Sequence, residues 1–390
     1  MRIGIDAKPL GAQYGGIRRY TEELVRGLAR VDGDNEYLLF SVPADHGAED
    51  LGPRVARASH AFPLKSWLDL LRLAGAKGRI DLFHGTNYSA PLAADFPTVL
   101  TVHDLTVKLF PQHHPRLRRI HHLALPVLCR RAARIIAVSH KTKADLVRYL
   151  GIEADKIDVV YLAVGGEFHP IRDAEVCARV RRRYGLPEAF GLFVGSVEPR
   201  KNLAVLIRAM AALRREGLPQ RLVIAGSGPR PYVESLHAAI RAEGLESGTD
   251  VVLCESVENA DLPALYSMAD VFVYPSLYEG FGLPPFEAMA CGAPVLVPDN
   301  SSFTELYGDY GLMLDLRGPE GMAEAIRRVL LDARLRGELI EKGLRHARSR
   351  TWEDTAAETL AVYRRVGSLP FARRHLLAAR PRPAEREGRA

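Results

Sequence analysis

The chain alternates short apolar runs with longer segments in which apolar side chains recur every three or four positions. Runs of the first kind are typical of buried strands, and segments of the second kind are typical of amphipathic helices. In the first half the pattern predicts strands at 3–6, 37–41, 81–84, 98–103, 134–139 and 157–161. Helices are predicted between them at about 17–30, 66–75, 115–132 and 140–150.

The second half repeats this alternation. Strands are predicted at 190–195, 221–225, 251–254, 271–275, 294–298 and 312–314, with helices between them, among which are 173–184 and 201–215. Strands alternating with helices indicate parallel sheets joined by crossover helices, so two such runs predict two doubly wound α/β domains. We expect a first domain over 1–168, a second over 169–351, helices over 352–379 and a basic disordered tail over 380–390.

Composition narrows the class of protein. A chain of 390 residues is long for one hydrophobic core, and 47% hydrophobic with 26% charged residues is close to the soluble average. The apolar run at 123–129 is far shorter than the roughly 18 residues that span a bilayer, and the N-terminus has no apolar signal region. We therefore expect a cytoplasmic protein. Its four scattered cysteines predict neither disulfides nor a zinc site.

The formal charge of +6 is unevenly distributed. Residues 364–390 hold eight Arg and two Glu and so carry the whole excess, and residues 105–144 hold nine Lys or Arg with no Asp or Glu. The predicted helix at 115–132 is either an ordinary helix with a solvated basic face or one that lies on anionic lipid. The two basic stretches together predict contact with an anionic membrane surface. Nucleic acid is not expected as a partner, because no groove-reading element accompanies them.

Residues 274–297 contain the most candidate groups for ligand binding. A strand ends near Pro275, a turn follows through Gly280, and two prolines open a short helix, which aims the backbone N–H groups of Phe281, Gly282 and Leu283 at one point suited to a phosphate. Glu279 in the turn and Glu287 in the first helical turn flank that point, where carboxylates would accept hydrogen bonds from sugar and ribose hydroxyls. The alternative is an ordinary strand-to-helix turn with solvated carboxylates.

Arg200 and Lys201 follow the first strand of the second half, at the predicted start of helix 201–215. Two cations at the carboxyl end of a strand suit a diphosphate and would offset charge on a departing phosphate. Alternatively they are an exposed basic pair, although the dipole at a helix start disfavours cations. The turn at Gly226 either lines a nucleotide site or is a plain tight turn, and it lacks the third glycine of a dehydrogenase fingerprint.

The string from Glu279 to Glu287 and on to Val295 resembles the signature of the GT4 family of retaining glycosyltransferases. Other segments that resemble the family lie at 15–20, 83–87, 102–104, 137–139, 194–203, 224–229, 262–266 and 352–363. The resemblance implies a GT-B fold, in which two Rossmann-like domains face each other across a cleft and the last helix crosses back onto the first domain.

The resemblance also assigns roles. It places Arg200 and Lys201 on the donor diphosphate, Glu279 on the transferred sugar, Glu287 on the ribose and His103 beside the sugar, with Asp104 orienting that histidine. Ser196 stands where some members have an Arg, Ser256 and Val257 lie where related enzymes hold the base, and Gly15 and Gly16 would face the donor phosphates or the acceptor. The carboxylate of the neighbouring Glu255 could accept a hydrogen bond from a guanine. The alternative is that this side chain faces solvent. His84, Asn87 and Tyr88 could touch the acceptor, with core or turn roles as the alternative.

No metal and no cofactor are expected, because the adjacent pairs His113-His114 and His121-His122 lack a nearby acid and do not resemble a zinc ligand set. The resemblance, which is greatest to bacterial mannosyltransferases of polysaccharide synthesis, implies a retaining hexosyltransferase. It would move a hexose from a nucleotide diphosphate sugar, with GDP-mannose as the expected donor, to a hydroxyl of a glycan or lipid-linked glycan. The alternatives are an enzyme of the same fold using UDP- or ADP-glucose and a non-catalytic nucleotide-sugar-binding protein. Epimerases and phosphorylases share the architecture but not this motif set.

Overall fold

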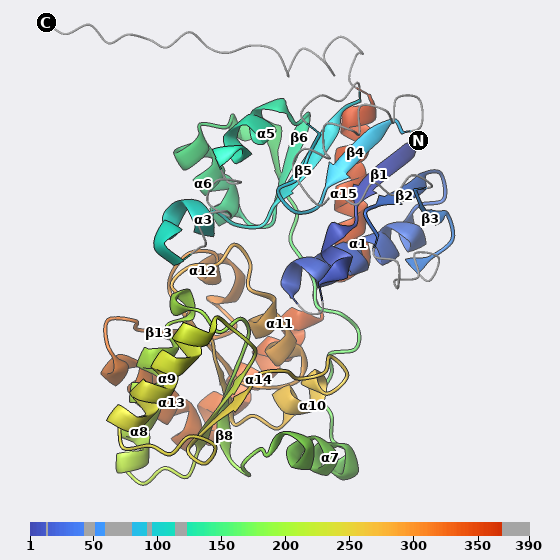
Figure 1. Ribbon diagram of the computed structural model, residues 1–390. Helices are drawn as coiled ribbons and strands as arrows, with labels where there is room; N and C mark the ends of the chain where they lie inside the picture. Colours follow the sequence, from blue (N-terminus) through green and yellow to red (C-terminus); the bar gives the residue numbers. More distant parts are fainter. Residues whose placement is uncertain (13–14, 43–50, 59–79, 92–95, 114–122, 369–390) are drawn as a thin grey trace, which may run out of the picture.

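The computed structural model describes residues 1–12, 15–42, 51–58, 80–91, 96–113 and 123–368. Figure 1 shows two lobes, each built on a parallel sheet with helices packed against it. The predicted helix at 66–75, the predicted tail over 380–390 and residues 115–122 of the predicted helix at 115–132 lie outside the described residues. The predicted α/β class with two doubly wound sheets is confirmed.

The first sheet has the strand order β3-β2-β1-β4-β5-β6-β7, with every pair parallel. The strands are β1 (Arg2–Asp6), β2 (Glu36–Phe40), β3 (Val55–Arg57), β4 (Leu82–Gly85), β5 (Thr98–Val102), β6 (Arg134–Ala137) and β7 (Ile157–Val159). The apolar pattern missed β3, because this edge strand has three residues and buries only Val55. The order reverses between β1 and β4, which is where such sheets bind ligands.

Four described helices of the first lobe surround this sheet together with the C-terminal helix. They are α1 (Gly16–Val31), α3 (Thr106–Leu109), α5 (Leu125–Arg131) and α6 (His140–Leu150), and the C-terminal helix is α15 (Trp352–Gly367). Ser139 caps α6 by accepting a hydrogen bond from the backbone N–H of Thr142. In the part of the chain that the structure describes, none of the helices combines the length and apolarity needed to cross a membrane.

The second sheet has the order β10-β9-β8-β11-β12-β13, again all parallel, and reverses between β8 and β11. Its strands are β8 (Phe190–Val194), β9 (Arg221–Ala225), β10 (Val251–Cys254), β11 (Val271–Val273), β12 (Val295–Pro298) and β13 (Leu312–Leu314). Its helices are α7 (Ala174–Tyr184), α8 (Leu203–Arg215), α9 (Arg230–Ala242), α10 (Leu262–Ser267), α11 (Leu283–Ala290), α12 (Phe303–Tyr307), α13 (Pro319–Leu331) and α14 (Ala333–Ala347). Because helices cover both faces, strand residues such as Phe193 and Phe272 are fully buried.

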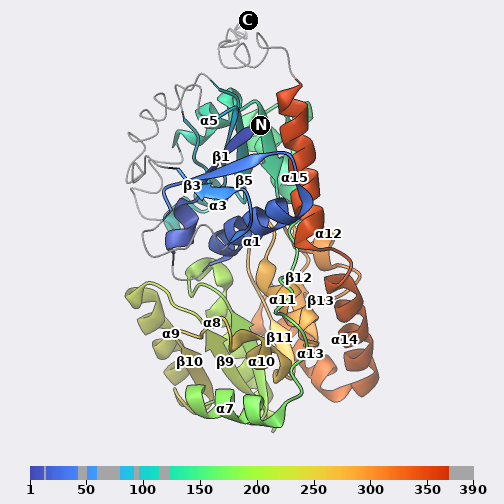
Figure 2. The same cartoon turned by 90° about the vertical axis from the view of Figure 1, so that its right-hand side faces the viewer.

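The C-terminal helix α15 leaves the second lobe after α14 and packs along α1 of the first, as Figure 2 shows. The two helices approach closely at Gly27, where a Cβ atom would lie 2.8 Å from the backbone oxygen of Trp352. Arg30 donates to Glu353 at 2.6 Å beside this contact. A capping box between Thr351 and Asp354 fixes the start of α15. The last helix is therefore part of the first lobe.

Candidate active site

A cleft of about 730 Å³ lies between the two lobes, at the carboxyl ends of the strands where both sheets reverse their order. The fold brings to this cleft every residue that the sequence indicated for catalysis or donor binding, together with Asp104. These residues are Gly15, Gly16, His103, Ser196, Arg200, Lys201, Gly226, Ser256, Val257, Glu279, Gly280, Phe281, Gly282, Leu283 and Glu287. Residues that are up to 272 positions apart in the chain thus share one cavity.

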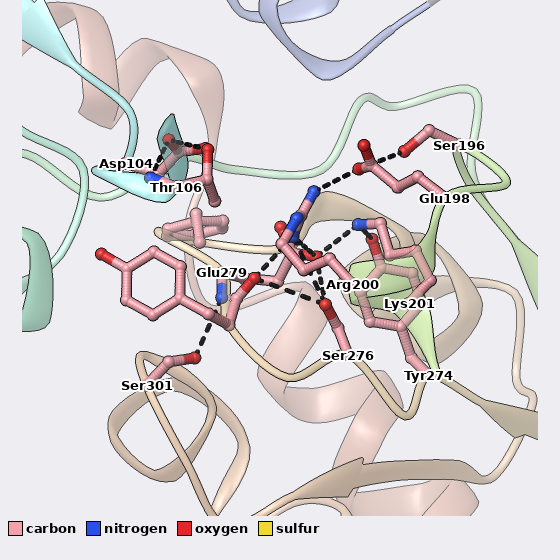
Figure 3. Close-up of polar contacts among 12 residues, drawn as sticks. Asp104, Thr106, Ser196, Glu198, Arg200, Lys201, Tyr274, Ser276, Glu279 and Ser301 are labelled. Carbon is pink, nitrogen blue, oxygen red and sulfur yellow. Dashed lines mark hydrogen bonds and ion pairs between the residues drawn. The ribbon is translucent and has the colours of Figure 1, made fainter. Parts of the chain in front are cut away.

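Glu279 lies at the centre of a buried charge cluster, which Figure 3 shows. Its carboxylate accepts from Arg200 Nη1 at 2.6 Å and from Ser276 Oγ at 2.7 Å, and it also accepts from Lys201. Burial raises the pKa of Glu279, but Arg200 and Lys201 outweigh it and lower the pKa to about 2. Glu279 is therefore ionised at neutral pH and can only accept hydrogen bonds.

The two cations have further partners in the second lobe. Arg200 Nη2 donates to Glu198 at 2.6 Å, and Lys201 Nζ donates to Tyr274 Oη at 2.7 Å. Both cations lie in a 3₁₀ turn, Pro199–Lys201, rather than at the start of helix 201–215 as predicted. The helix begins only at Leu203, because Asn202 adopts a left-handed conformation with φ 58°. This turn aims both side chains into the cleft.

The predicted anion site is formed by the turn before α11. Gly282 has a φ of 85°, a conformation that L-residues rarely adopt, and α11 begins at the next residue. The first N–H groups of a helix have no partner within the helix, and Gly282 and Leu283 at this end of α11 line the cleft. Gly280 lies against the first lobe, where a Cβ atom would be 1.6 Å from the carbonyl oxygen of His103. The anion site is therefore closed over by the other domain.

Glu287 was predicted in the first helical turn, but it is the fifth residue of α11 and lies one turn further in. It is buried, and both of its carboxylate oxygens have protein partners. Oε1 accepts from Arg19 of α1, and Oε2 accepts from Tyr266 Oη at 2.7 Å. Because α1 belongs to the first lobe, the ion pair between Arg19 and Glu287 crosses the cleft.

His103 lies at the end of β5 with its ring almost buried. Its Nε2 donates to the carbonyl of Thr86 at 2.8 Å, and the edge of its ring faces Tyr20 with the centroids 4.8 Å apart. Burial lowers the pKa of this imidazole, so His103 is neutral at neutral pH. With the proton on Nε2, the lone pair of Nδ1 is left to accept a hydrogen bond.

Asp104 does not orient His103, contrary to the prediction. Its Oδ1 accepts from the backbone N–H of Thr106 at 2.9 Å and from the Thr106 hydroxyl at 2.7 Å. This side chain therefore closes a local turn before α3, and the ring of His103 is oriented by a backbone carbonyl instead. The Asp104 backbone N–H donates to Tyr88 Oη at 2.9 Å.

Of the two roles left open for His84, the structure shows the core role and not contact with the cleft. The side chain is fully buried between the sheet and α15, with Nδ1 2.6 Å from Tyr363 Oη and Nε2 2.7 Å from Thr101 Oγ1. Burial lowers the pKa of His84 to about 3. Asn87 and Tyr88, predicted with it, also do not line the cleft. Tyr88 supports the backbone of Asp104, and Asn87 Oδ1 is buried without a hydrogen-bond partner among the described residues.

The residues predicted near the base also line the cleft. Ser256, Val257 and Glu255 line it from the second lobe, and the polar face of α1 lines it from the first. Gly226 has a φ of 142°, and a Cβ atom there would lie 1.9 Å from the carbonyl oxygen of Gly195. Only glycine fits this position, so the tight-turn and the pocket-lining interpretations of Gly226 both hold.

Three residues of the site were missed by the sequence. Tyr274 and Ser276 hold Lys201 and Glu279, and Arg19 pairs with Glu287. All three lie within segments that the sequence already indicated. Tyr274 and Ser276 lie at the end of a predicted strand and Arg19 follows the glycine pair, and these positions could have identified them as site residues. What was missing was the partner of each side chain.

The described residues offer neither the ligand set of a metal site nor a disulfide pair. Within residues 1–12, 15–42, 51–58, 80–91, 96–113 and 123–368 no group of three or more His, Cys, Asp or Glu side chains could hold a metal ion. All four cysteines are free thiols. The charges that face the cleft are therefore those of its arginines, lysine and carboxylates.

Two polar contacts beside the cleft hold the lobes against each other. Tyr278 Oη donates to Asp145 of α6 at 2.6 Å. Glu305 of α12 accepts from the backbone N–H groups of His140 and Lys141 at 2.8 and 2.9 Å, at the N-terminus of α6. A carboxylate at this end of a helix is favourable for the helix dipole.

Comparison with known proteins identifies both halves of the chain. Residues 14–165 match the family described as Glycosyltransferase Family 4, and residues 180–346 match Glycosyl transferases group 1. An O-antigen chain mannosyltransferase B of Escherichia coli is 31% identical over 388 residues, which cover 93% of this chain and all of that protein. The mannosyltransferase WbdA of the same species is 31% identical over 73% of this chain and 36% of its own longer sequence.

A solved structure shows the same architecture. HepE of Anabaena, in a complex with UDP and glucose, superposes with a TM-score of 0.75 at 20% identity, covering 95% of this chain and all of the other. At that identity the likeness establishes the fold, which is the GT-B arrangement that the sequence predicted. Together with the matched halves and the full-length relative, it shows that the chain belongs to family 4 of the glycosyltransferases.

Proposed function

We propose that this glycosyltransferase moves a mannosyl unit from GDP-mannose to a hydroxyl of a glycan or lipid-linked glycan, with retention of the anomeric configuration. The observation that carries the proposal is the cluster of Arg200, Lys201 and Glu279 beside the N-terminus of α11, inside the cleft between the lobes. The mannosyltransferases of Escherichia coli among its relatives favour the sugar.

The charges of the cluster suit a nucleotide diphosphate sugar. Arg200 and Lys201 would bind the diphosphate and stabilise the charge that develops on it as the bond to the sugar breaks. Glu279 would accept hydrogen bonds from the sugar hydroxyls, a role that fits a carboxylate kept ionised by a pKa of about 2. A carboxylate of such low pKa is a weak base, so it is a poor choice for deprotonating the acceptor.

We therefore favour attack of the acceptor hydroxyl on the same face from which the diphosphate leaves. The bond between the anomeric carbon and the phosphate oxygen breaks, the bond to the acceptor oxygen forms, and the departing diphosphate takes the acceptor proton. His103 would hold the transferred sugar through the lone pair of Nδ1. The two cations and the α11 terminus would carry the charge that a divalent ion carries elsewhere, so we propose a metal-independent reaction.

The first test is a panel of GDP-mannose, UDP-glucose and ADP-glucose, each with and without EDTA. Thermal stabilisation of the whole chain and slow donor hydrolysis are the readouts. GDP-mannose should give the largest response, and EDTA should leave it unchanged. A larger response to UDP- or ADP-glucose would show that GDP-mannose is not the donor. A strict metal requirement would overturn the metal-free mechanism. Binding without hydrolysis or transfer would favour the non-catalytic alternative. The anomeric configuration of the product, read by NMR, tests retention.

We also propose that the enzyme acts at the cytoplasmic face of an anionic membrane. The described part of the basic region supports this, because Leu123, just before α5, and Val127 within it are 77% and 44% exposed, and α5 also carries the exposed Arg130 and Arg131. Apolar and basic side chains on one helix favour the interface of an anionic bilayer. Sedimentation with vesicles containing anionic lipid should capture the full chain, and removal of residues 369–390 should weaken the capture. Equal capture by neutral vesicles would contradict the proposal.

A further inference from the structure

Arg19 connects the first lobe to the carboxylate that the family pattern places on the ribose. It lies on α1, one helical position before the buried Tyr20, and pairs with Glu287 on α11 of the second lobe. The two side chains are 17% and 5% exposed, so the pair is largely removed from water. A buried ion pair of this kind is costly to break, because it leaves one charge without a partner.

The guanidinium of Arg19 is held by a second contact. It stacks over the ring of Phe168 at 4.6 Å from the centroid, and Phe168 belongs to the segment that joins the two sheets. The ring of Phe168 in turn packs against that of Tyr266, the other partner of Glu287. Arg19 belongs to the first lobe and contacts both the connecting segment and the second lobe, so its contacts depend on how the lobes are placed.

The hydrogen bonds on Glu287 leave room for a diol. An ionised carboxylate has two oxygens with about two lone-pair positions each. Arg19 occupies one position on Oε1, and Tyr266 Oη occupies one on Oε2 at 2.7 Å. One position on each oxygen remains, and a ribose has two adjacent hydroxyls that donate side by side. The two protein partners thus fix the orientation of the carboxylate and leave one acceptor position on each oxygen.

We propose that Arg19 is a positioning residue for the donor ribose, which orients Glu287 and makes ribose binding depend on closure of the two lobes. The inference rests on the proposed nucleotide-sugar function and deepens it. Since Arg19 comes from the opposite lobe, the ribose subsite is complete only when the cleft is closed. A donor with its ribose in place would therefore favour the closed enzyme, and removal of Arg19 would weaken that link.

A cycle of variants and nucleotides tests the inference. Dissociation constants are measured by calorimetry for GDP and for 2′,3′-dideoxy-GDP, on the full wild-type chain and on Arg19→Met. The variant should bind GDP roughly tenfold or more weakly, while its affinity for the dideoxy nucleotide should change by less than about threefold. Tyr266→Phe removes the other hydrogen bond to Glu287. It should also weaken the binding of GDP more than that of the dideoxy nucleotide. Arg19→Lys should restore part of the loss.

Arg30→Met is the matched control, because Arg30 lies on the same helix and pairs with Glu353 away from the cleft. It should bind both nucleotides as the wild type does. An equal loss for GDP and dideoxy-GDP in Arg19→Met would show a merely structural role, and tighter GDP binding would show that Arg19 competes with the ribose; either result overturns the inference. If the wild type binds none of GDP, UDP and ADP, the proposed function falls as well, whereas nucleotide binding with no ribose-dependent loss overturns the inference alone.

Discussion

The α-carbon of Gly280 in the second lobe faces the backbone carbonyl of His103 in the first, so closely that a Cβ atom would lie 1.6 Å from the carbonyl oxygen. Thr142 Oγ1 donates toward both segments, 3.3 Å from the His103 carbonyl oxygen and 3.5 Å from the Gly280 carbonyl oxygen. This contact sets the distance between the anion site at α11 and the strand end that carries His103. The glycine therefore determines how far the cleft can close.

Gly280→Ala should keep the lobes apart. Because the added methyl group overlaps a backbone atom that cannot rotate away, we expect kcat/KM for transfer to fall roughly 100-fold, as expected for a reacting centre displaced by about 1 Å. Binding of GDP should fall by no more than the roughly tenfold expected for Arg19→Met, because separating the lobes removes Arg19 from Glu287 but leaves the contacts of the second lobe in place. Steady-state kinetics and calorimetry measure the two effects. Gly166→Ala, where a Cβ atom meets nothing within 4 Å, is the control, and an equally impaired control would contradict the explanation.

Lys201→Ala should remove transfer while leaving the chain folded. Glu279 keeps Arg200 and Ser276 as partners, so it is not left as an isolated buried charge. Loss of a group that stabilises a developing charge costs on the order of 10²–10³ in kcat. Transfer assays and far-UV circular dichroism provide the readouts, and Arg215→Ala, an exposed cation of α8 paired with Glu243, is the control. Full activity of Lys201→Ala would end the diphosphate assignment.

His84 should make the protein sensitive to acid without affecting the acceptor. Its pKa is about 3 in the folded protein, against 6.5 for an ordinary histidine, because burial disfavours the imidazolium. The unfolded chain therefore binds more protons below pH 6.5, and stability is lost as the pH falls from 6.5 toward 3, by up to about 1.4 kcal/mol per pH unit. Urea unfolding at pH 7 to 4 should show a shallower decline for His84→Gln than for the wild type.

Two controls separate His84 from other groups. His237→Gln makes the same substitution at a partly exposed histidine of α9, and the decline of stability in that variant should be steeper than in His84→Gln. At neutral pH the KM for the acceptor should be the same in His84→Gln and in the wild type, because His84 does not reach the cleft. A selective rise in that KM would restore His84 as an acceptor contact.

Gly27→Ala should weaken the packing of α15 on α1. The new methyl group would lie 2.8 Å from the Trp352 carbonyl oxygen and 2.9 Å from Ala356 Cβ, so the helices must separate. Overpacking of this kind costs about 1–3 kcal/mol, which exceeds the gain of about 1 kcal/mol from replacing a helical glycine. Thermal unfolding should show a lower midpoint. Gly337→Ala in α14 meets nothing within 4 Å and should be neutral or stabilising, so a lower midpoint there would refute the argument.

The errors of the sequence-based predictions have a common cause. His84 and His103 are the last residues of the predicted strands 81–84 and 98–103, and nothing in the pattern separates them. In the structure α15 packs against the first lobe and its Tyr363 contacts the buried His84, whereas His103 lines the cleft. Asp104 follows His103 in sequence but bonds to Thr106, because the backbone turns there. Adjacency in the sequence thus suggested a contact between the side chains of Asp104 and His103 that the folded backbone does not allow.

By itself the sequence determined the two parallel sheets, the glycine turn before α11 and the residue types that meet an anion. These features depend on local periodicity, on backbone conformations open only to glycine, and on which groups can carry charge. Only the tertiary structure decided which charges are paired: Glu279 with two cations of its own lobe, Glu287 with Arg19 of the other. Such pairings depend on the distance between residues far apart in the chain, and packing of the two lobes alone sets that distance.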